Sequence, residues 1–570
     1  MTLRTYIDRA IHDGADFDAV ISGCDVQQTF CWQPDMCITD ACEAEYRALL
    51  DAEVRVLAAA PGERFSIIEI CTDRLFLGDA FSRCTAGYCS PREYRRLRGR
   101  AFAAGWHLTS GADKTTIQTE FLKGVQTMLH HSIIKPNHMQ IPWHDPIRDQ
   151  KELPISQAPL PIRAGVVGRV GLLLLSCGTG AWRVRSSMNE IAEALGLVCA
   201  ADIGLLSIEY TCSDGENSFS QTLTLTATGV NTAKLDQLER FVKRFPLDGV
   251  YMTADDLHTK LDKIAQTGGS YTPLQLGLAA ALACGGFTFL LGGGPIEMLL
   301  AFLGAGVGQY VRARLTQRHL TLFGCIALSV AAACLVYAGL FRLASLLFPI
   351  DPQHQAGYIC AMLFIIPGFP FITSGIDMAK QDMRSGFERL AYAIMIVVVA
   401  TLTAWLMALL LRLQPMDFLP LGLPVWARIL LRLAMSFCGV FGFSLMFNSP
   451  VKLASVAAVI GALSNTLRLE LVSLAGFPPA AAAFFGALTA GLLASLYKRR
   501  SGYPRITITV PSIVIMVPGL YFYRAVYDLG TMNLGDSASW LAASLLIVIA
   551  LPLGLICARI LTDGSFRRCT

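Results

Sequence analysis

The sequence IIPGF at residues 365–369 and the sequence MVPGL at residues 516–520 place the same Pro-Gly pair inside two long apolar runs. In each run an aspartate, Asp377 or Asp528, lies ten residues after the proline. Proline has no backbone N–H and glycine weakens a helix, so the pattern predicts a membrane helix that is interrupted at each Pro-Gly pair.

A second pair of matching positions supports a repeat in the apolar part of the sequence. Pro295 and Pro450 each precede an apolar run, and each is followed eleven residues later by a glycine, Gly306 or Gly461. The offset is 155 residues for these pairs and 151 for the Pro-Gly pairs, in one order along the chain. Together the matches indicate a duplicated unit of five helices. Because five is odd, the second copy is expected to cross the membrane in the opposite sense, the inverted-repeat plan of secondary transporters.

Apolar runs long enough to cross a bilayer, about 20 residues each, fill the chain beyond Leu276. The fold class expected is therefore a polytopic α-helical membrane protein with about ten transmembrane helices, arranged as two inverted five-helix repeats. The approximate spans are Leu276–Leu291, Pro295–Val311, Leu320–Phe341, Tyr358–Ile376, Leu390–Leu411, Ile429–Phe447, Val451–Leu467, Ala480–Tyr497, Ile506–Tyr523 and Ser537–Ala558.

Composition divides the chain into two halves. Of its 570 residues 53% are hydrophobic and 16% charged, with a mean hydropathy of +0.48, which excludes a purely water-soluble protein. Of the 90 charged residues, 60 fall within residues 1–275. The net charge of +4 is too small for this length to indicate nucleic-acid binding, so no nucleic-acid partner is expected.

Basic residues of the membrane half predict the orientation. With the amino terminus inside, fourteen lie on the inner side and six on the outer side, so both termini are expected in the cytoplasm. The inner residues are Arg312, Arg314, Arg318, Lys380, Arg384, Arg389, Lys452, Lys498, Arg499, Arg500, Arg505, Arg559, Arg567 and Arg568. The outer residues are Arg342, Arg412, Arg428, Arg432, Arg468 and Arg524.

The domain organisation follows from these patterns. Proline-rich residues 153–162 suggest a linker. After it come a short apolar helix at Arg163–Leu175, an amphipathic helix at Ser187–Leu197, a hairpin of strands Ile203–Thr211 and Ser220–Thr228, and helices at Asn231–Arg244 and Ala254–Ala265. The expected units are a cytoplasmic extension of unknown role at 1–152, the linker, a cytoplasmic α+β domain at 163–275, and membrane units at 276–413 and 427–560.

Cysteines and the chain start bear on cofactors. No apolar signal segment follows the initial methionine, and a cytosolic amino-terminal half implies that most of the 17 cysteines are free thiols. The gaps between Cys31, Cys37 and Cys42 do not match the paired spacing of structural zinc sites, although zinc binding by this cysteine-rich start is left open. No cofactor and no metal ligand is assigned.

The candidate transport path consists of the helix breaks and the polar residues beside them. Plain helix kinks and loop carboxylates are the simpler alternatives, but interrupted segments at corresponding positions mark the binding region in inverted-repeat transporters, and acids near the membrane often bind protons. Glu297 is a weaker candidate, and Gln309 and Asn465 offer hydrogen bonds to a solute or between helices. The candidate residues are Pro295, Pro367, Gly368, Asp377, Asn448, Pro450, Pro518, Gly519 and Asp528.

Several stretches together resemble the threonine/serine exporter family of bacterial inner-membrane proteins. They are Gly178-x-x-Ala181-Trp182-Arg183-Val184, Met188-x-x-Ile191-Ala192, Ala194-Leu195-Gly196, the hairpin, Gly229-Val230-Asn231-x-x-Lys234-Leu235, Pro367-Gly368, Asn448-Ser449-Pro450 and Pro518-Gly519. The likeness covers about residues 160–560. It implies ten transmembrane helices, a cytoplasmic amino-terminal domain and proton-driven export of small amino acids or related organic acids across the inner membrane. Where the family usually has acids, this sequence has Ser176 and Arg185.

Three function classes remain at this point. The first is an exporter of small polar amino acids of the threonine/serine class, with small dicarboxylic acids as the alternative solute, and with protons and the bilayer as further partners. The second is a membrane-tethered enzyme, for which no spacing of nucleophile and base is visible. Its candidate side chains are Cys177, His107, His130, His131, His138 and His144. The third is a sensor, which needs fewer helices. A homo-oligomer is left open.

Overall fold

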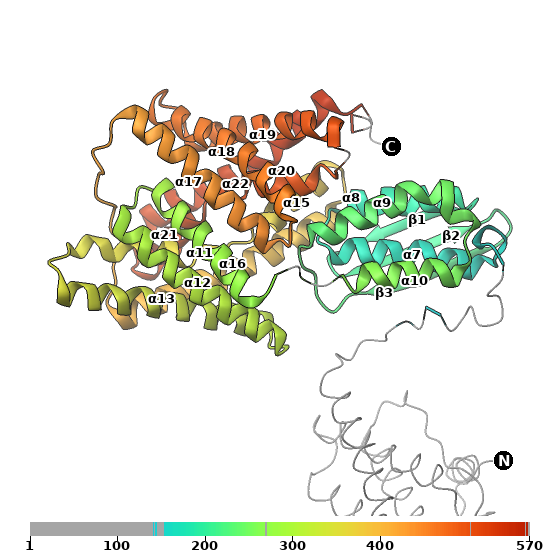
Figure 1. The fold of residues 1–570 in the computed structure, drawn as a ribbon, viewed down its shortest axis with the longest axis horizontal. Helices are drawn as coiled ribbons and strands as arrows, with labels where there is room; N and C mark the ends of the chain where they lie inside the picture. The colour runs from blue at the N-terminus through green and yellow to red at the C-terminus, as the bar shows by residue number, and fades with distance from the viewer. Residues whose placement is uncertain are drawn as a thin grey trace, which may run out of the picture. The chain divides into compact units, whose positions relative to one another are not determined.

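The structure is a computed structural model, and it describes residues 141, 143–144, 153–267, 269, 271–501, 503–564 and 566–567. Within residues 1–140 the sequence predicts a helix at Ala41–Ala59 and a basic segment at Arg92–Arg100. Both of these, and the early cysteines, lie outside the described residues. What is described falls into an α+β domain followed by a helical core (Figure 1).

The α+β domain packs helices against an antiparallel sheet of order β1-β2-β3. Along β2 the inward residues Ile208, Tyr210 and Cys212 are buried and alternate with more exposed ones, which is the pattern of a sheet covered on one face. Helix α7 contacts β2 and β3, and α8 contacts β1. The elements are α7 (Leu160–Ser176), α8 (Ala181–Ala194), β1 (Val198–Ile203), β2 (Ser207–Ser213), β3 (Ser218–Thr224), α9 (Thr232–Asp248) and α10 (Ala254–Ala265).

This domain differs from its prediction in two places. The strand predicted at Ile203–Thr211 is divided, because Gly204 N donates to Ser207 O at 2.8 Å and turns the chain between β1 and β2. Of β1 only Ile203 is predicted to lie in a strand, and residues 198–202 are assigned to no predicted element. The amphipathic helix predicted at Ser187–Leu197 also differs. That helix, α8, instead begins directly after Gly180 and ends at Ala194.

The proline-rich segment belongs to the domain that follows it. Pro154 pairs with Thr253 in an isolated bridge, and Ile155 N donates to Met252 O at 2.8 Å. Ile155 is completely buried, and Pro159 caps α7. Residues 153–162 are therefore packed against the domain rather than forming a free connection.

The helical core consists of long apolar helices and two bent pairs. Its elements are α11 (Pro273–Leu290), α12 (Pro295–Gln317), α13 (Leu322–Leu347), η4 (Pro352–Gly357), α14 (Tyr358–Ala361), η5 (Leu363–Ile365), α15 (Gly368–Ala379), α16 (Met383–Leu411), α17 (Val425–Met446), α18 (Val451–Ser473), α19 (Pro479–Ser501), α20 (Ile506–Ile513), η6 (Val514–Met516), α21 (Gly519–Gly530) and α22 (Leu534–Thr562).

Seven of the described helices are long and apolar enough to cross a membrane, and up to nine spans result if each bent pair counts as one. Their outer faces expose many large apolar side chains, Leu346, Leu410 and Trp426 among them, as expected of lipid-facing helices. The protein is a multi-pass membrane protein. Helix α12, the predicted second span, does not meet the same criterion, so the tenth span stays a prediction.

Three of the element pairs that the predicted repeat relates have equal lengths. Helices α12 and α18 have 23 residues each, α15 and α21 have 12 each, and α16 and α22 have 29 each. Across the halves α11 packs on α17, α15 on α22 and α16 on α21. The halves therefore exchange equivalent contacts.

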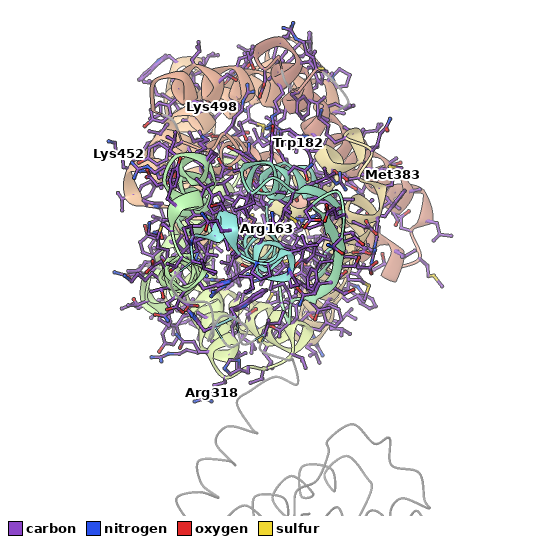
Figure 2. All side chains as sticks on the ribbon, turned by 90° about the vertical axis from the view of Figure 1, so that its right-hand side faces the viewer. Arg163, Trp182, Arg318, Met383, Lys452 and Lys498 are labelled. Atoms are coloured by element: carbon purple, nitrogen blue, oxygen red, sulfur yellow. The ribbon has the colours of Figure 1, made fainter. Side chains whose placement is uncertain are left out.

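The core has two ends, which we call the domain end and the far end. The domain end contains the start of α16 at Met383 and the end of α17 at Met446, and the far end contains Leu411 and Val425. Figure 2 looks onto the domain end, where Met383 and the basic residues Arg318, Lys452 and Lys498 are labelled with Trp182 of the domain.

Candidate functional site

The two predicted helix breaks are present. Pro367 precedes α15 with φ −82° and ψ 63°, and Pro518 precedes α21 with φ −82° and ψ 58°, so the two prolines share one backbone conformation. The helical segments on either side are bent by 53° at the first break and by 43° at the second. Each proline lies at a helix start, the position where its missing N–H costs least.

The breaks pack against each other. A Cβ built on Gly368 would collide with Cγ2 of Val514, and one built on Gly519 would lie 2.8 Å from Cδ2 of Leu363 and 3.0 Å from Cγ1 of Ile366. Each glycine therefore accommodates the short helix that precedes the other break. This close approach requires glycine at both positions.

A cavity of about 190 Å³ adjoins the first break at the domain end. It is lined by residues 364–370 and by polar groups of Gln309, Arg312, Arg389 and Tyr392, and its lining has no carboxylate. Gln309 is 7% exposed, and its Oε1 has no donor among the described residues. An unpaired buried acceptor costs about 1–3 kcal/mol, which favours a ligand that donates to it.

Arg312 supplies an uncompensated positive charge to the cavity. Its side chain makes neither an ion pair nor a hydrogen bond with any described residue. Arg389, by contrast, is neutralised by Asp377. A guanidinium fork together with a free amide oxygen can bind the carboxylate and the ammonium or hydroxyl group of a small amino acid.

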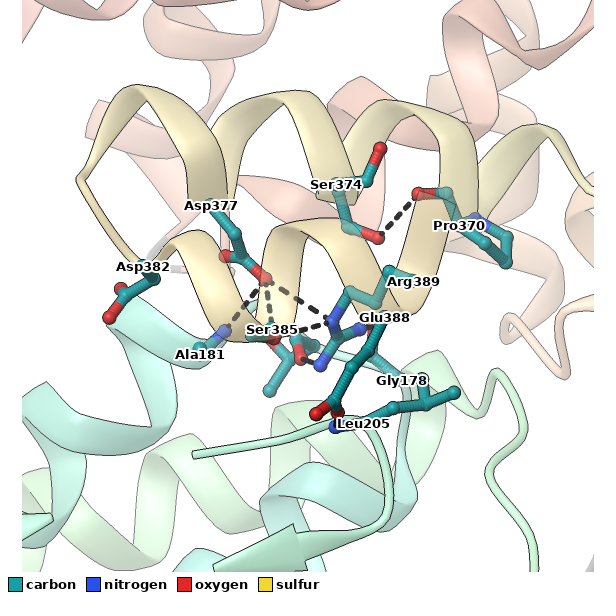
Figure 3. A network of polar contacts seen from close by, with 12 residues as sticks. Gly178, Ala181, Leu205, Pro370, Ser374, Asp377, Asp382, Ser385, Glu388 and Arg389 are labelled. Carbon is teal, nitrogen blue, oxygen red and sulfur yellow. Dashed lines mark hydrogen bonds and ion pairs between the residues drawn. The ribbon is translucent and has the colours of Figure 1, made fainter. Parts of the chain in front are cut away.

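Asp377 is fully buried beside this cavity (Figure 3). Its Oδ2 lies 3.2 Å from Nε of Arg389 and accepts hydrogen bonds of 3.1 Å from the hydroxyl of Ser385 and from the backbone N of Ala181. The tight turn between α15 and α16 brings the carboxylate and the guanidinium together. The network joins both core helices to the α+β domain.

The loop of the domain that meets this network contains the Gly-x-x-Ala sequence. Arg389 donates to the carbonyl oxygens of Gly178 at 3.2 Å and Thr179 at 2.7 Å. Gly178 has φ 76°, a conformation that glycine adopts without strain. A Cβ on Gly180 would lie 2.5 Å from Oδ1 of Asp377. The positive φ of Gly178 and the close approach of Gly180 to the core therefore account for the two glycines.

Further polar contacts fix the domain to the core. Arg185 pairs with Asp382 at 2.5 Å, so the basic residue at a position where an acid was expected has an acidic partner in the core. Arg384 pairs with Asp202, and the hydroxyls of Thr232 and Ser449 are 2.8 Å apart.

The remaining candidates lie elsewhere. Asp528 is half-buried near the far end, so the two aspartates lie toward opposite ends of the core. Asn448, with φ 56°, and Pro450 form the turn between α17 and α18 at the domain end, and the Oδ1 of Asn448 has no partner among the described residues. Pro295 begins α12 at the far end.

Glu297, the weaker candidate, has a defined role at the start of α12. It is buried, accepts a hydrogen bond of 3.0 Å from the backbone N of Gly294, and lies 2.7 Å from Nδ1 of His354. This is the capping position that an acid near a helix start favours.

Sequence reasoning missed the functional importance of several arginines. Arg312 and Arg389 entered it only as orientation signals, although each is a basic residue close to a membrane span and could have been flagged on that ground. Cys177, considered for an enzyme, is buried, and burial raises the pKa of its thiol to about 11. A thiol of that pKa is a poor nucleophile at neutral pH.

Two apposed helix breaks and a polar cavity beside one of them, in a multi-pass membrane protein, are features that membrane transporters share. The family model described as "Putative threonine/serine exporter" matches residues 165–411, and the one described as "Threonine/Serine exporter, ThrE" matches residues 432–561. The chain belongs to the threonine/serine exporter family.

Relatives agree with this assignment. A "Probable threonine/serine exporter" of Mycobacterium tuberculosis is 26% identical over 393 residues, which is 65% of this chain and 70% of the relative. A "Probable succinate transporter subunit YjjP" of Klebsiella aerogenes is 25% identical over 244 residues, 41% of this chain and 90% of the relative. Its Escherichia coli namesake is 30% identical over 134 residues, 22% of this chain and 51% of the relative. No solved structure matches the chain.

Proposed function

We propose that the protein is a secondary exporter of small amino acids of the threonine/serine class, driven by the proton gradient. The observation that carries the proposal is the cavity beside Pro367, where the unpaired guanidinium of Arg312 and the free Oε1 of Gln309 face the same space. A zwitterion needs one cationic and one accepting partner, and these two residues provide both. The site is built at a helix break, where irregular backbone at membrane depth can line a cavity.

Small dicarboxylic acids are the second candidate. The relatives named as probable succinate transporter subunits favour it, as does a lining that contains two arginines and no acid. The two candidates differ in one testable feature, because only the amino acid makes use of Gln309 Oε1.

The proposal includes two inverted five-helix repeats with both termini in the cytoplasm of a bacterial cell. Matching helix lengths and exchanged contacts between the halves support the repeat. Phe566, near the carboxyl end, contacts Trp182 of the domain with ring centroids 5.7 Å apart. This contact supports a location of the domain and the carboxyl end on the same side of the membrane.

Asp377 is the proposed proton-responsive group on the domain side. Its protonation would remove the charge that holds Arg389, and Arg389 in turn holds the loop at Gly178. The domain loop and the cavity would then respond together to the proton. Asp528 is retained as the second acid of the path, toward the opposite end.

Counterflow in liposomes tests the function. Liposomes that contain the purified full-length protein are loaded with unlabelled threonine, serine or succinate. Uptake of the same solute, labelled and added outside, is then followed. Arg312→Gln is expected to raise the half-saturating concentration at least tenfold, since charge-assisted hydrogen bonds contribute about 1.5–3 kcal/mol. Arg318→Gln, an exposed arginine directly after the end of the same helix, is the matched control. Equal behaviour of both variants would contradict the site.

Gln309→Leu distinguishes the two solute classes. Loss of threonine exchange with retention of succinate exchange assigns the amide to an ammonium or hydroxyl group. Equal effects on both solutes would contradict that role.

A further inference from the structure

A second cavity, of about 690 Å³, lies at the far end of the core. Its lining includes the α16–α17 connection at residues 417–423, the end of α18 and the start of α21. Four arginines and a single acid line it, and they are Arg428, Arg432, Arg468, Arg524 and Asp417. The cavity is therefore strongly cationic.

Two of these arginines are neutralised locally. Arg432 pairs with Glu470 at 2.7 Å and also donates to Ser473 at 2.9 Å. Arg524 pairs at 2.6 Å with Asp417, whose side chain is 88% exposed. These pairs account for the acids near the cavity.

The other two arginines are not neutralised by any described residue. Arg428 is partly buried, and its Nε has no acceptor among the described residues. Arg468 donates from Nε to Oδ1 of Asn465 at 2.9 Å, and within the described chain its terminal nitrogens make no bond. Two uncompensated cations facing one cavity favour an anionic ligand.

Arg468 corresponds to Arg312 of the first cavity. Both belong to helices of 23 residues, and Arg468 precedes the end of α18 at Ser473 by as many residues as Arg312 precedes the end of α12 at Gln317. Each arginine has an amide three residues before it, Asn465 in α18 as Gln309 in α12. Pro367 and Gly368 line the first cavity, and Leu520, the residue after Gly519, lines the second.

The two amides are used differently. Asn465 is completely buried, with Oδ1 accepting from Arg468 and Nδ2 donating to the hydroxyl of Ser436 at 2.9 Å. Its oxygen already accepts from the guanidinium of Arg468, whereas Oε1 of Gln309 accepts from no described residue. The far-end cavity is suited to a carboxylate and the domain-end cavity to a carboxylate with a donor group.

We propose that the far-end cavity is a second solute site, in which Arg468 binds the carboxylate of the exported acid. The inference rests on the proposed function and adds a site at the opposite end of the path. Arg428 adds charge to this site, and Asn465 positions Arg468. The solute carboxylate passes from one arginine to its counterpart in the other half of the molecule.

Sided exchange measures this site separately from the first. Right-side-out and inside-out vesicles from cells expressing the full chain present opposite faces to labelled threonine or succinate. Arg468→Gln is expected to raise the half-saturating concentration at least tenfold at one face only, and Arg312→Gln at the other face. Arg412→Gln, at the far end but outside the cavity lining, is the matched control, and Arg468→Lys should restore part of the affinity.

The outcomes separate the two proposals. If the wild-type protein exchanges no acid of the panel, the proposed function fails. If the wild type exchanges normally and Arg468→Gln equals Arg412→Gln at both faces, the second site is wrong. Purified protein is also compared in phosphatidylcholine vesicles with and without phosphatidylglycerol. If phosphatidylglycerol lowers the wild-type affinity to the level of Arg468→Gln, a lipid phosphate occupies the cavity and the solute site is overturned.

Discussion

Asp377 and Arg389 form a buried ion pair of 3.2 Å between consecutive core helices, and the same guanidinium binds two carbonyl oxygens of the α+β domain. A buried pair of this kind does not by itself add stability, because desolvation of both charges offsets their attraction. The role of the ion pair is to hold the domain loop in place against the first helix break.

Replacing Asp377 by asparagine should therefore be costly. The change leaves Arg389 buried without its counter-charge, for which about 3–5 kcal/mol is typical. We expect slower proton-driven efflux and a lower melting temperature, with solute exchange less affected. Arg389→Gln in the same chain should restore much of the stability. Asp351→Asn, exposed at the far end, is the control, and wild-type efflux across a range of pH in Asp377→Asn would contradict the assigned role.

Asp528→Asn should also slow proton-driven efflux, but with little loss of stability because its carboxyl is only half-buried. Efflux and thermal unfolding of the same preparations measure the two effects. Unchanged efflux at every pH would remove Asp528 from the path.

The apposed glycines give a packing prediction. Gly368→Ala places a methyl group against Val514 and, at 3.2 Å, against Val517, so we expect destabilisation of about 1–3 kcal/mol and slower transport. Gly339→Ala is the matched control in a membrane helix, because nothing lies within 4 Å of its added Cβ. Thermal unfolding in detergent compares the two. Equal melting temperatures would show that the breaks are not closely packed.

The contacts of Trp143 with the α+β domain predict how far the amino-terminal segment can be truncated. Trp143 stacks on His258 with centroids 5.8 Å apart, and the buried Arg169 lies 5.5 Å from the Trp143 ring. Deleting residues 1–138 preserves these contacts, and deleting residues 1–152 removes them. We expect the first variant to transport and the second to melt at a lower temperature, as measured by thermal unfolding. Loss of transport in the shorter deletion at normal membrane levels would place residues 1–138 in the mechanism.

His144 makes the same contact region sensitive to pH. Hydrogen bonds to Asp262 and Asp255, of 2.8 and 2.7 Å, raise its pKa above 6.5. The stabilisation is therefore fully present below pH 6.5 and is lost as pH rises through the raised pKa. His144→Ala should lower the melting temperature more at pH 5.5 than at pH 9. Burial lowers the pKa of His258 to about 3, so His258 stays neutral over this range; an equal effect at both pH values would contradict the ion pairs.

The sequence predicted the core more closely than the site. Apolar runs and prolines located the membrane helices, and the repeated Pro-Gly pairs located both breaks, because bilayer thickness and the missing proline N–H act locally along the chain. The strand β1 was missed because Gly204 divides a continuous apolar and β-branched stretch without a stronger turn signal. The partners of Asp377 could not be predicted, since Ala181 lies 196 residues away and only folding brings it near.

That separation has a consequence for biogenesis. Domains generally fold as units, those nearest the amino terminus first during synthesis. The loop at Gly178–Ala181 is thus expected to be shaped before the ribosome has made Asp377 and Arg389, and it offers two carbonyl oxygens and one backbone N–H at the membrane surface. When the α15–α16 hairpin is inserted, Asp377 and Arg389 neutralise each other and bind the polar groups of a loop that has already folded. The α+β domain would then act as an assembly template for the helices that follow it. If the domain misfolded, the α15–α16 hairpin would lack its polar partners and would not stay inserted in the membrane.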